Sequence, residues 1–179
     1  MNKTTSLLLI AVFAIGLKAQ ESPVKKGPSV VMLPIGVANV TRGKANPVEL
    51  RFRIENGFHI NSNKPSAEYL IPTTLRVDAQ TDIALGKSTY PEGKEMSFEF
   101  APEEKLSVYS GDFPITVSVR PLASVLPGKY AFRGELKYQA CDNRACYPPK
   151  KLPVLFEVKV IKAPPPAKKN PAQSPHIHN

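Results

Sequence analysis

Hydrophobic and polar residues alternate along several stretches of the chain, a pattern typical of β-strands with one buried face. The clearest stretch, 48–55, places an apolar residue at every second position between charged ones. The same period of two recurs at 113–119, 130–138 and 154–160. Weaker candidates are 30–37, 75–77, 83–90, 96–100 and 106–109. We therefore predict eight or nine short strands and no helix.

Turn-forming residues separate these stretches and support the assignment. They are Asn56-Gly57, Pro91-Glu92-Gly93, Ser110-Gly111-Asp112 and Pro127-Gly128. Short strands at this spacing predict an all-β fold, an antiparallel β-sandwich in which each sheet has one packed and one wet face. The 19 prolines also argue against long helices.

The two ends differ from this strand-rich middle. Residues 1–19 resemble a signal peptide, with Lys3 ahead of an apolar run over 7–17 that is too short to span a bilayer comfortably. An uncleaved anchor is the alternative. We expect a linker over 20–27, a sandwich domain over 28–161 and a disordered, Pro- and Lys-rich tail over 162–179. The expected location is the periplasm or another exported compartment, with no membrane span after signal cleavage.

Charge and composition narrow the classes of function. The net charge of +9 comes partly from lysines in the two ends, and no basic stripe interleaved with aromatic residues suggests nucleic-acid binding. No catalytic triad, paired-carboxylate site or phosphate loop stands out. His176 and His178 in the tail could hold a metal ion loosely, but an ordinary tail is the simpler interpretation, and we expect no metal site.

The chain has 2 cysteines, and they are the main candidate for chemistry. Cys141 and Cys146 enclose the segment Asp-Asn-Arg-Ala, which suits a hairpin loop that places the two sulfurs opposite each other. In an oxidising compartment the pair is expected to form a disulfide.

The sequence leaves open whether this disulfide is structural or reactive. A loop of about six residues constrains the unfolded chain by only about 2 kcal/mol, against about 4 kcal/mol for a loop of about sixty. Strand parity puts Cys141 on the face of Lys137 and Gln139, hence near the surface unless a bulge intervenes. Arg144 is a candidate for lowering a thiol pKa by favouring the thiolate. These arguments leave both interpretations open.

The cysteine segment resembles a known family. YQAC at 138–141 followed by CYPP at 146–149 is similar to the amino-terminal periplasmic domain of DsbD-type protein-disulfide reductases. Weaker similarity lies at 57–61 (GFHIN), 70–72 (LIP), 90–93 (YPEG) and 106–111 (LSVYSG). The resemblance covers 28–161 and implies an immunoglobulin-like fold.

The resemblance implies an electron relay. The cysteines would accept electrons from a membrane-embedded dithiol and pass them to exported thioredoxin-fold proteins. Cys146 would form the mixed disulfide with the partner, and Cys141 would resolve it. Full-length members of the family continue into a membrane domain and a thioredoxin-like domain. Here the expected electron donor is a separate membrane-embedded dithiol reductase.

Six more residues belong to the predicted site. By resemblance, Phe98, Glu99 and Phe100 would form an aromatic cap over the cysteines, although Phe98 and Phe100 also suit an ordinary strand core. His59 is either a proton carrier near the thiols or a structural histidine. Tyr138 and Tyr147 either pack against the disulfide or fill the end of the sandwich.

The predicted function is an exported thiol–disulfide exchange module, an oxidoreductase of the protein-disulfide reductase type with no bound cofactor. The alternative is a non-enzymatic immunoglobulin-like binding module with a structural hairpin disulfide. A second alternative is a subunit that tethers envelope proteins through its basic tail.

Overall fold

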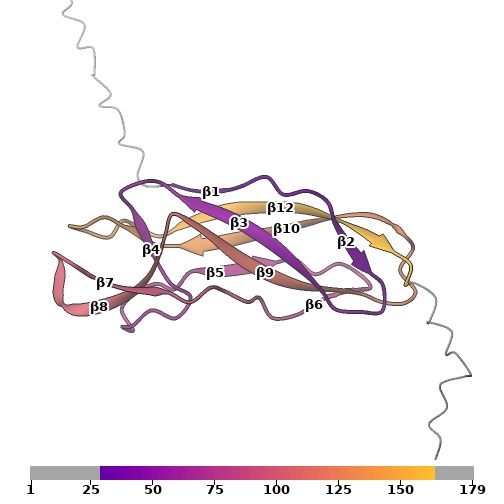
Figure 1. The fold of residues 1–179 in the computed structure, drawn as a ribbon, viewed down its shortest axis with the longest axis horizontal. Helices are drawn as coiled ribbons and strands as arrows, with labels where there is room; N and C mark the ends of the chain where they lie inside the picture. Colours follow the sequence, from indigo (N-terminus) through magenta and orange to yellow (C-terminus); the bar gives the residue numbers. More distant parts are fainter. Residues whose placement is uncertain (1–28, 164–179) are drawn as a thin grey trace, which may run out of the picture.

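The computed structural model describes residues 29–163, and all of their regular structure is strand. Figure 1 shows the strands running along an elongated body. No helix in this part of the chain is long and apolar enough to cross a membrane. The expected signal peptide, the linker and the tail histidines lie outside the described residues.

Twelve strands form three sheets of four. Their bounds are β1 (Val30–Met32), β2 (Ala38–Thr41), β3 (Asn46–Ile54), β4 (His59–Asn61), β5 (Thr74–Val77), β6 (Ile83–Leu85), β7 (Lys94–Phe98), β8 (Ala101–Ser110), β9 (Asp112–Pro121), β10 (Gly128–Tyr138), β11 (Ala140–Cys141) and β12 (Lys150–Ile161). The sheet orders are β1-β3-β9-β6, β2-β12-β10-β5 and β11-β4-β8-β7. All pairs are antiparallel except β2 with β12, which is parallel.

The first two sheets pack face to face and bury the main core. The alternation predicted from the sequence is present, because every second residue is buried throughout β9, from Val48 in β3 and from Val154 in β12. The largest wholly buried side chains include Phe52, Phe132, Leu50, Ile115 and Leu136. The predicted all-β, immunoglobulin-like antiparallel sandwich is confirmed.

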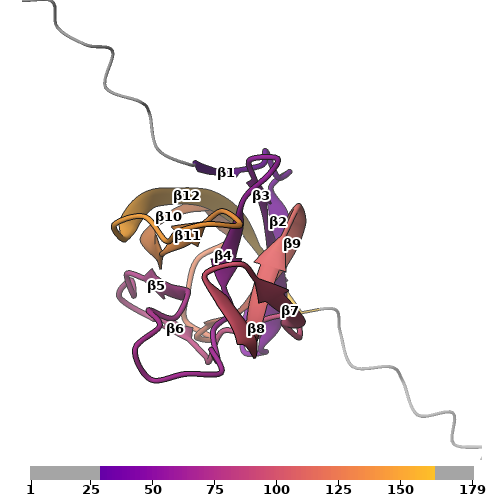
Figure 2. The ribbon, with the colours of Figure 1, turned by 90° about the vertical axis from the view of Figure 1, so that its left-hand side faces the viewer.

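The third sheet lies at one end of the sandwich, where it faces the viewer in Figure 2. It consists largely of continuations of sandwich strands. A turn at Asn56-Gly57 leads from β3 to β4, and Gly111 links β8 directly to β9 of the first sheet. Gly57 and Gly111 both have positive φ, which glycine adopts without a steric penalty. The two core sheets therefore set the position of the end sheet.

Two expectations from the sequence need correction. The described chain has twelve strands instead of eight or nine, because strands change sheet and are divided there, and because β4 is too short to show a period. The prediction that Cys141 lies near the surface is wrong. Ala140 stays in the main core with Tyr138, so the period of two continues and Cys141 lies on the opposite face. That face is also covered, because β11 pairs with β4 in the end sheet and Phe98 stacks on His59, the partner of Cys141. Cys141 is 0% exposed.

Candidate functional site

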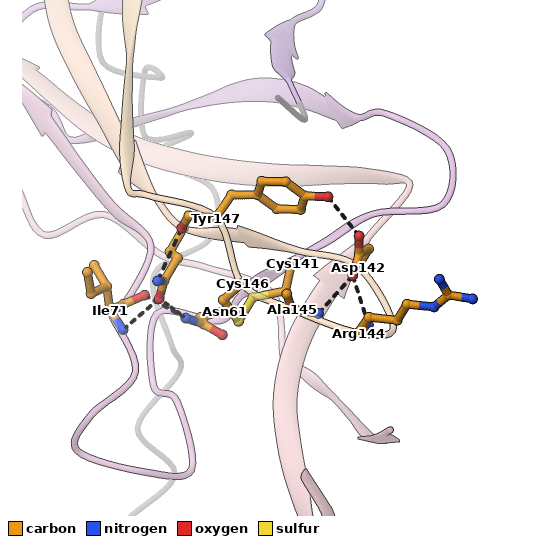
Figure 3. Close-up of a disulfide and its surroundings, with 9 residues drawn as sticks. Asn61, Ile71, Cys141, Asp142, Arg144, Ala145, Cys146 and Tyr147 are labelled. Carbon is orange, nitrogen blue, oxygen red and sulfur yellow. Dashed lines mark hydrogen bonds between the residues drawn. A yellow bond between two sulfur atoms is a disulfide. The ribbon is translucent and has the colours of Figure 1, made fainter. Parts of the chain in front are cut away.

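A disulfide joins the two cysteines at the end of the sandwich. Cys141 is the last residue of β11, and Cys146 forms an isolated antiparallel bridge with it across the four-residue loop. The sulfurs are bonded and the Cα atoms are 3.9 Å apart (Figure 3). The predicted hairpin is therefore confirmed, and neither cysteine is free.

The side chain of Asp142 organises the loop. Its Oδ1 accepts hydrogen bonds from the backbone N–H groups of Arg144 and Ala145, each at 2.8 Å, and its Oδ2 accepts one from the Tyr147 hydroxyl at 2.8 Å. These bonds, led by the one from Arg144, lower the pKa of Asp142 below its ordinary value. The ionised carboxylate therefore holds Cys146 opposite Cys141 at neutral pH.

The two sulfur-bearing residues differ in exposure. Cys141 is wholly buried, whereas Cys146 belongs to the exposed part of the loop, together with Asn143, Arg144 and Ala145. A thiolate arriving from solvent therefore has access to the Cys146 side of the bond.

The neighbouring strand β4 places His59 beside the disulfide. His59 is the cross-strand partner of Cys141, so the two side chains share one face of the end sheet. The imidazole is 5% exposed, and burial lowers the pKa of His59 from 6.5 to about 4, against an opposing influence from Asp142. His59 is therefore neutral at pH 7, and its Nε2 atom is buried without a hydrogen-bond partner.

Asn61 lies two residues further along β4 and is 0% exposed. Its Nδ2 donates to Ile71 O at 3.0 Å and to Gln139 Oε1 at 3.2 Å. Gln139 Nε2 in turn donates to Tyr147 O at 3.3 Å, which connects β4 to the cysteine loop (Figure 3). The other polar atom of this carboxamide, Asn61 Oδ1, is buried without a partner.

The tip of the β7–β8 hairpin covers His59. Phe98 stacks on the imidazole with a centroid distance of 3.9 Å, and Phe100 stacks on Phe98 at 5.5 Å. Glu99 between them accepts a 2.6 Å hydrogen bond from Asn143 Nδ2 in the cysteine loop. Phe98 also packs in a second small core with Leu70, Leu106 and Val108. The hairpin tip thus lies against the site and is also anchored in a core.

The remaining predicted site residues have distinct positions. Tyr147 packs edge-on against Phe58, with ring centroids 5.9 Å apart, besides its bond to Asp142. Tyr138 belongs to the main core, and its hydroxyl accepts a hydrogen bond from Val30 N at 3.2 Å. The Arg144 side chain extends away from the disulfide in Figure 3.

Sequence reasoning missed four residues that shape the site: Asn61, Gln139, Asp142 and Asn143. For Asn61 a signal was available, because a polar residue beside Ile60 in a short apolar segment is a candidate for a buried hydrogen-bonded position. The partnership of Asn143 with Glu99 joins residues 44 positions apart and has no local signature.

Together, the fold and the site define a β-sandwich protein with a cysteine pair, bonded as a disulfide, at one end. The family model described as "Thiol:disulfide interchange protein DsbD, N-terminal" matches residues 33–157. The chain belongs to this family, and its cysteine pair is that of a thiol–disulfide exchange module.

Solved structures give weaker similarities. The reduced form of the Neisseria meningitidis DsbD N-terminal domain is 21% identical with a TM-score of 0.40, covering 62% of this chain and 79% of that one. AggA, the major subunit of aggregative adherence fimbriae type I from Escherichia coli, is 10% identical with a TM-score of 0.37, covering 75% and 94%. A search of curated proteins gives no match.

Proposed function

We propose that this protein is an exported electron relay. It takes two electrons from a membrane-embedded dithiol and delivers them to thioredoxin-fold proteins in the same compartment. Family membership and the bonded pair Cys141–Cys146 support this role. The N-terminal apolar segment supports export, and the periplasm is the compartment that the family implies.

The first half-reaction reduces the disulfide. A thiolate of the donor attacks Cys146 Sγ, the S–S bond breaks, and Cys141 leaves with the electron pair and takes up a proton. The second donor thiol then attacks the sulfur of its own partner cysteine in the mixed disulfide. This step forms the donor disulfide and releases Cys146 as a thiol.

The second half-reaction reverses these events on an acceptor. The Cys146 thiolate attacks the disulfide of a thioredoxin-fold protein and forms a mixed disulfide. The Cys141 thiolate then attacks Cys146 Sγ, closes the original S–S bond and releases the acceptor as a dithiol. Two electrons and two protons pass in each cycle.

The single observation that carries this order is the difference in exposure across the bond. Cys146 is exposed and Cys141 is wholly buried, so a bulky partner can bond to Cys146 while Cys141 stays protected until it resolves the complex. This assignment agrees with the one that the sequence resemblance implies.

We assign to Phe98, Glu99 and Phe100 the role of a cap that restricts access. The tip that they form is stacked on His59 and hydrogen-bonded to Asn143, and displacing it would uncover His59 and the side of the disulfide that carries Cys141. The hydrogen bond between Glu99 and Asn143 is exposed, so breaking this bond costs little.

The order is tested with single-cysteine variants and a purified thioredoxin-fold disulfide isomerase. The isomerase carries its nucleophilic cysteine as a mixed disulfide with thionitrobenzoate. Cys141→Ala is expected to displace thionitrobenzoate and to form a stable covalent complex through Cys146. Cys146→Ser is expected to react at least tenfold more slowly, since its remaining thiol is buried.

Equal reaction of the two variants would contradict the assigned order. No reaction of either would favour the binding module with a structural disulfide. A redox titration separates the same alternatives, because a midpoint below about −300 mV is typical of structural disulfides.

A further inference from the structure

Two buried side-chain atoms stand out within residues 29–163 because they alone have no hydrogen-bond partner. They are His59 Nε2 and Asn61 Oδ1. An unpaired buried polar atom destabilises the fold, so native proteins rarely retain one without a functional reason. Two such atoms two residues apart on one strand call for a common explanation.

Both residues lie on the strand that pairs with the Cys141 segment. Residues two apart on a strand point to the same face, so His59 and Asn61 share a face of β4. Cys141 is the cross-strand partner of His59, and its side chain lies on this face as well. The Asn61 backbone N–H donates to Gln139 O at 3.3 Å, which places Asn61 further along the same pair of strands. Figure 3 includes Asn61 among the surroundings of the disulfide.

The surrounding contacts hold the two acceptors in place. The imidazole of His59 is stacked on Phe98 with the ring planes inclined by 11°. The carboxamide of Asn61 uses its nitrogen for Ile71 O and Gln139 Oε1, so its oxygen is the atom left over. Both groups are therefore fixed before any partner arrives.

The chemistry of sulfur explains why both atoms lack partners in the disulfide state. A disulfide sulfur carries no proton and cannot donate a hydrogen bond. Reduction converts the same two atoms into S–H groups, which are donors. Two donors then appear beside two fixed acceptors.

We propose that His59 and Asn61 form a receiving site for the reduced cysteines, in which His59 Nε2 shares a proton with Cys141 Sγ and Asn61 Oδ1 accepts the thiol proton of Cys146. The site is thus complete only in the dithiol state, and its hydrogen bonds favour reduction. The inference deepens the proposed function, on which it rests for the idea that both redox states are used.

The test is the equilibrium with dithiothreitol at fixed pH. In this reaction the protein S–S bond breaks, an S–S bond forms in dithiothreitol, and two protons pass to Cys141 and Cys146. His59→Phe keeps a ring against Phe98 but removes the nitrogen, and Asn61→Leu removes the oxygen. Each is expected to lower the equilibrium constant for reduction about three- to tenfold.

Two further variants separate this effect from general damage. His59→Gln supplies another acceptor and is expected to restore part of the lost constant. Thr73→Val removes a buried 2.6 Å hydrogen bond to the carbonyl of Asn61 without removing an acceptor from the cysteine face. It is expected to stay within about twofold of wild type, because a loss common to both redox states cancels.

Infrared spectroscopy gives a direct readout. The S–H stretching band of the reduced protein arises only from the 2 cysteines of the chain. It is expected at lower frequency in wild type than in the His59→Phe, Asn61→Leu double variant, because hydrogen bonding weakens the S–H bond.

The inference is overturned if both single variants keep the wild-type equilibrium constant within twofold, or if the band does not move. Neither measurement uses a protein partner. Failure of the relay would instead appear as failure of the covalent capture by Cys141→Ala, with the dithiothreitol equilibrium unaffected.

Discussion

His59 lies flat against Phe98, with the two ring centroids 3.9 Å apart, while Cys141 is its cross-strand partner in β11. The aromatic hairpin tip and the buried cysteine are thus connected through a single imidazole. Because Phe98 is 7% exposed, the hairpin cannot leave the site without uncovering apolar surface. This relationship gives the first prediction.

Phe98→Ala is expected to increase the rate at which dithiothreitol reduces the native disulfide about tenfold, and to lower the free energy of unfolding by about 3 kcal/mol. The rate increases because the ring that covers His59 is lost. The measurement is the mass shift of alkylated protein with time, together with urea unfolding. Leu106→Ala is the matched control, because Leu106 packs in the same small core and has no stacking contact with His59. If both variants accelerate reduction of the disulfide equally, the cause is the loss of stability and not the removal of the ring over His59.

The hydrogen bond from Asn143 to Glu99 should hold the hairpin against the cysteine loop. Glu99→Ala and Asn143→Ala are each expected to speed reduction of the disulfide about two- to fivefold, as suits an exposed charge-assisted bond. The double variant should be no faster than the faster single one, since the same contact is lost. Glu104 lies on the same hairpin and accepts a hydrogen bond from Tyr69 outside it. Glu104→Ala should leave the rate of reduction unchanged. Fully additive effects would rule out a direct role of the bond.

Asp142 should hold the cysteines in the geometry that favours the disulfide. Asp142→Ala removes the acceptor for Arg144, Ala145 and Tyr147, which frees the loop and lowers the effective concentration of one thiol at the other. The equilibrium with dithiothreitol should shift toward the dithiol about three- to tenfold. Asp142→Asn keeps an acceptor oxygen and should shift less. A shift toward the disulfide would contradict this account of the loop.

The disulfide form should lose stability in mild acid because of His59. Its pKa is lowered to about 4 in the folded state, so the unfolded chain binds the proton more tightly. The free energy of unfolding is therefore unaffected by His59 above about pH 6.5. It decreases by up to about 3 kcal/mol as the pH falls toward 4. Urea unfolding of the oxidised protein between pH 4 and 7 measures the slope.

His59→Phe should remove this part of the slope. Asp142 is the charged neighbour that opposes the lowering of the His59 pKa. It should keep its charge over this pH range, because its own pKa lies below the ordinary value of a carboxyl group. An unchanged slope in the variant would show that other groups cause the acid sensitivity.

Tyr138 should act through stability alone. Tyr138→Phe leaves the buried N–H of Val30 without its acceptor and is expected to cost about 1–2 kcal/mol in the free energy of unfolding. The redox equilibrium should stay within about twofold of wild type, because the hydroxyl supports β1 and no bond connects it to the cysteine loop. A larger shift of the redox equilibrium would show that Tyr138 also acts on the cysteine pair.

Much of the fold could be predicted because its signals are local. Alternation over 48–55 depends only on strand geometry, and β3 was predicted from it. The hairpin with Cys141 and Cys146 follows from a four-residue segment between two cysteines that begins with the turn-forming residues Asp142 and Asn143. The order in which sheets exchange strands was not predictable, and neither was the covering of Cys141 by the end sheet and the β7–β8 hairpin.

By itself, the amino-acid sequence determined most of the strands, the turns and the cysteine pair, because each depends on residues a few positions apart. Only the tertiary structure decided which cysteine is buried, that His59 faces it, and that Glu99 meets Asn143. These relationships join segments from separate parts of the chain. Their geometry is set by the packing of the two core sheets, which no local pattern records.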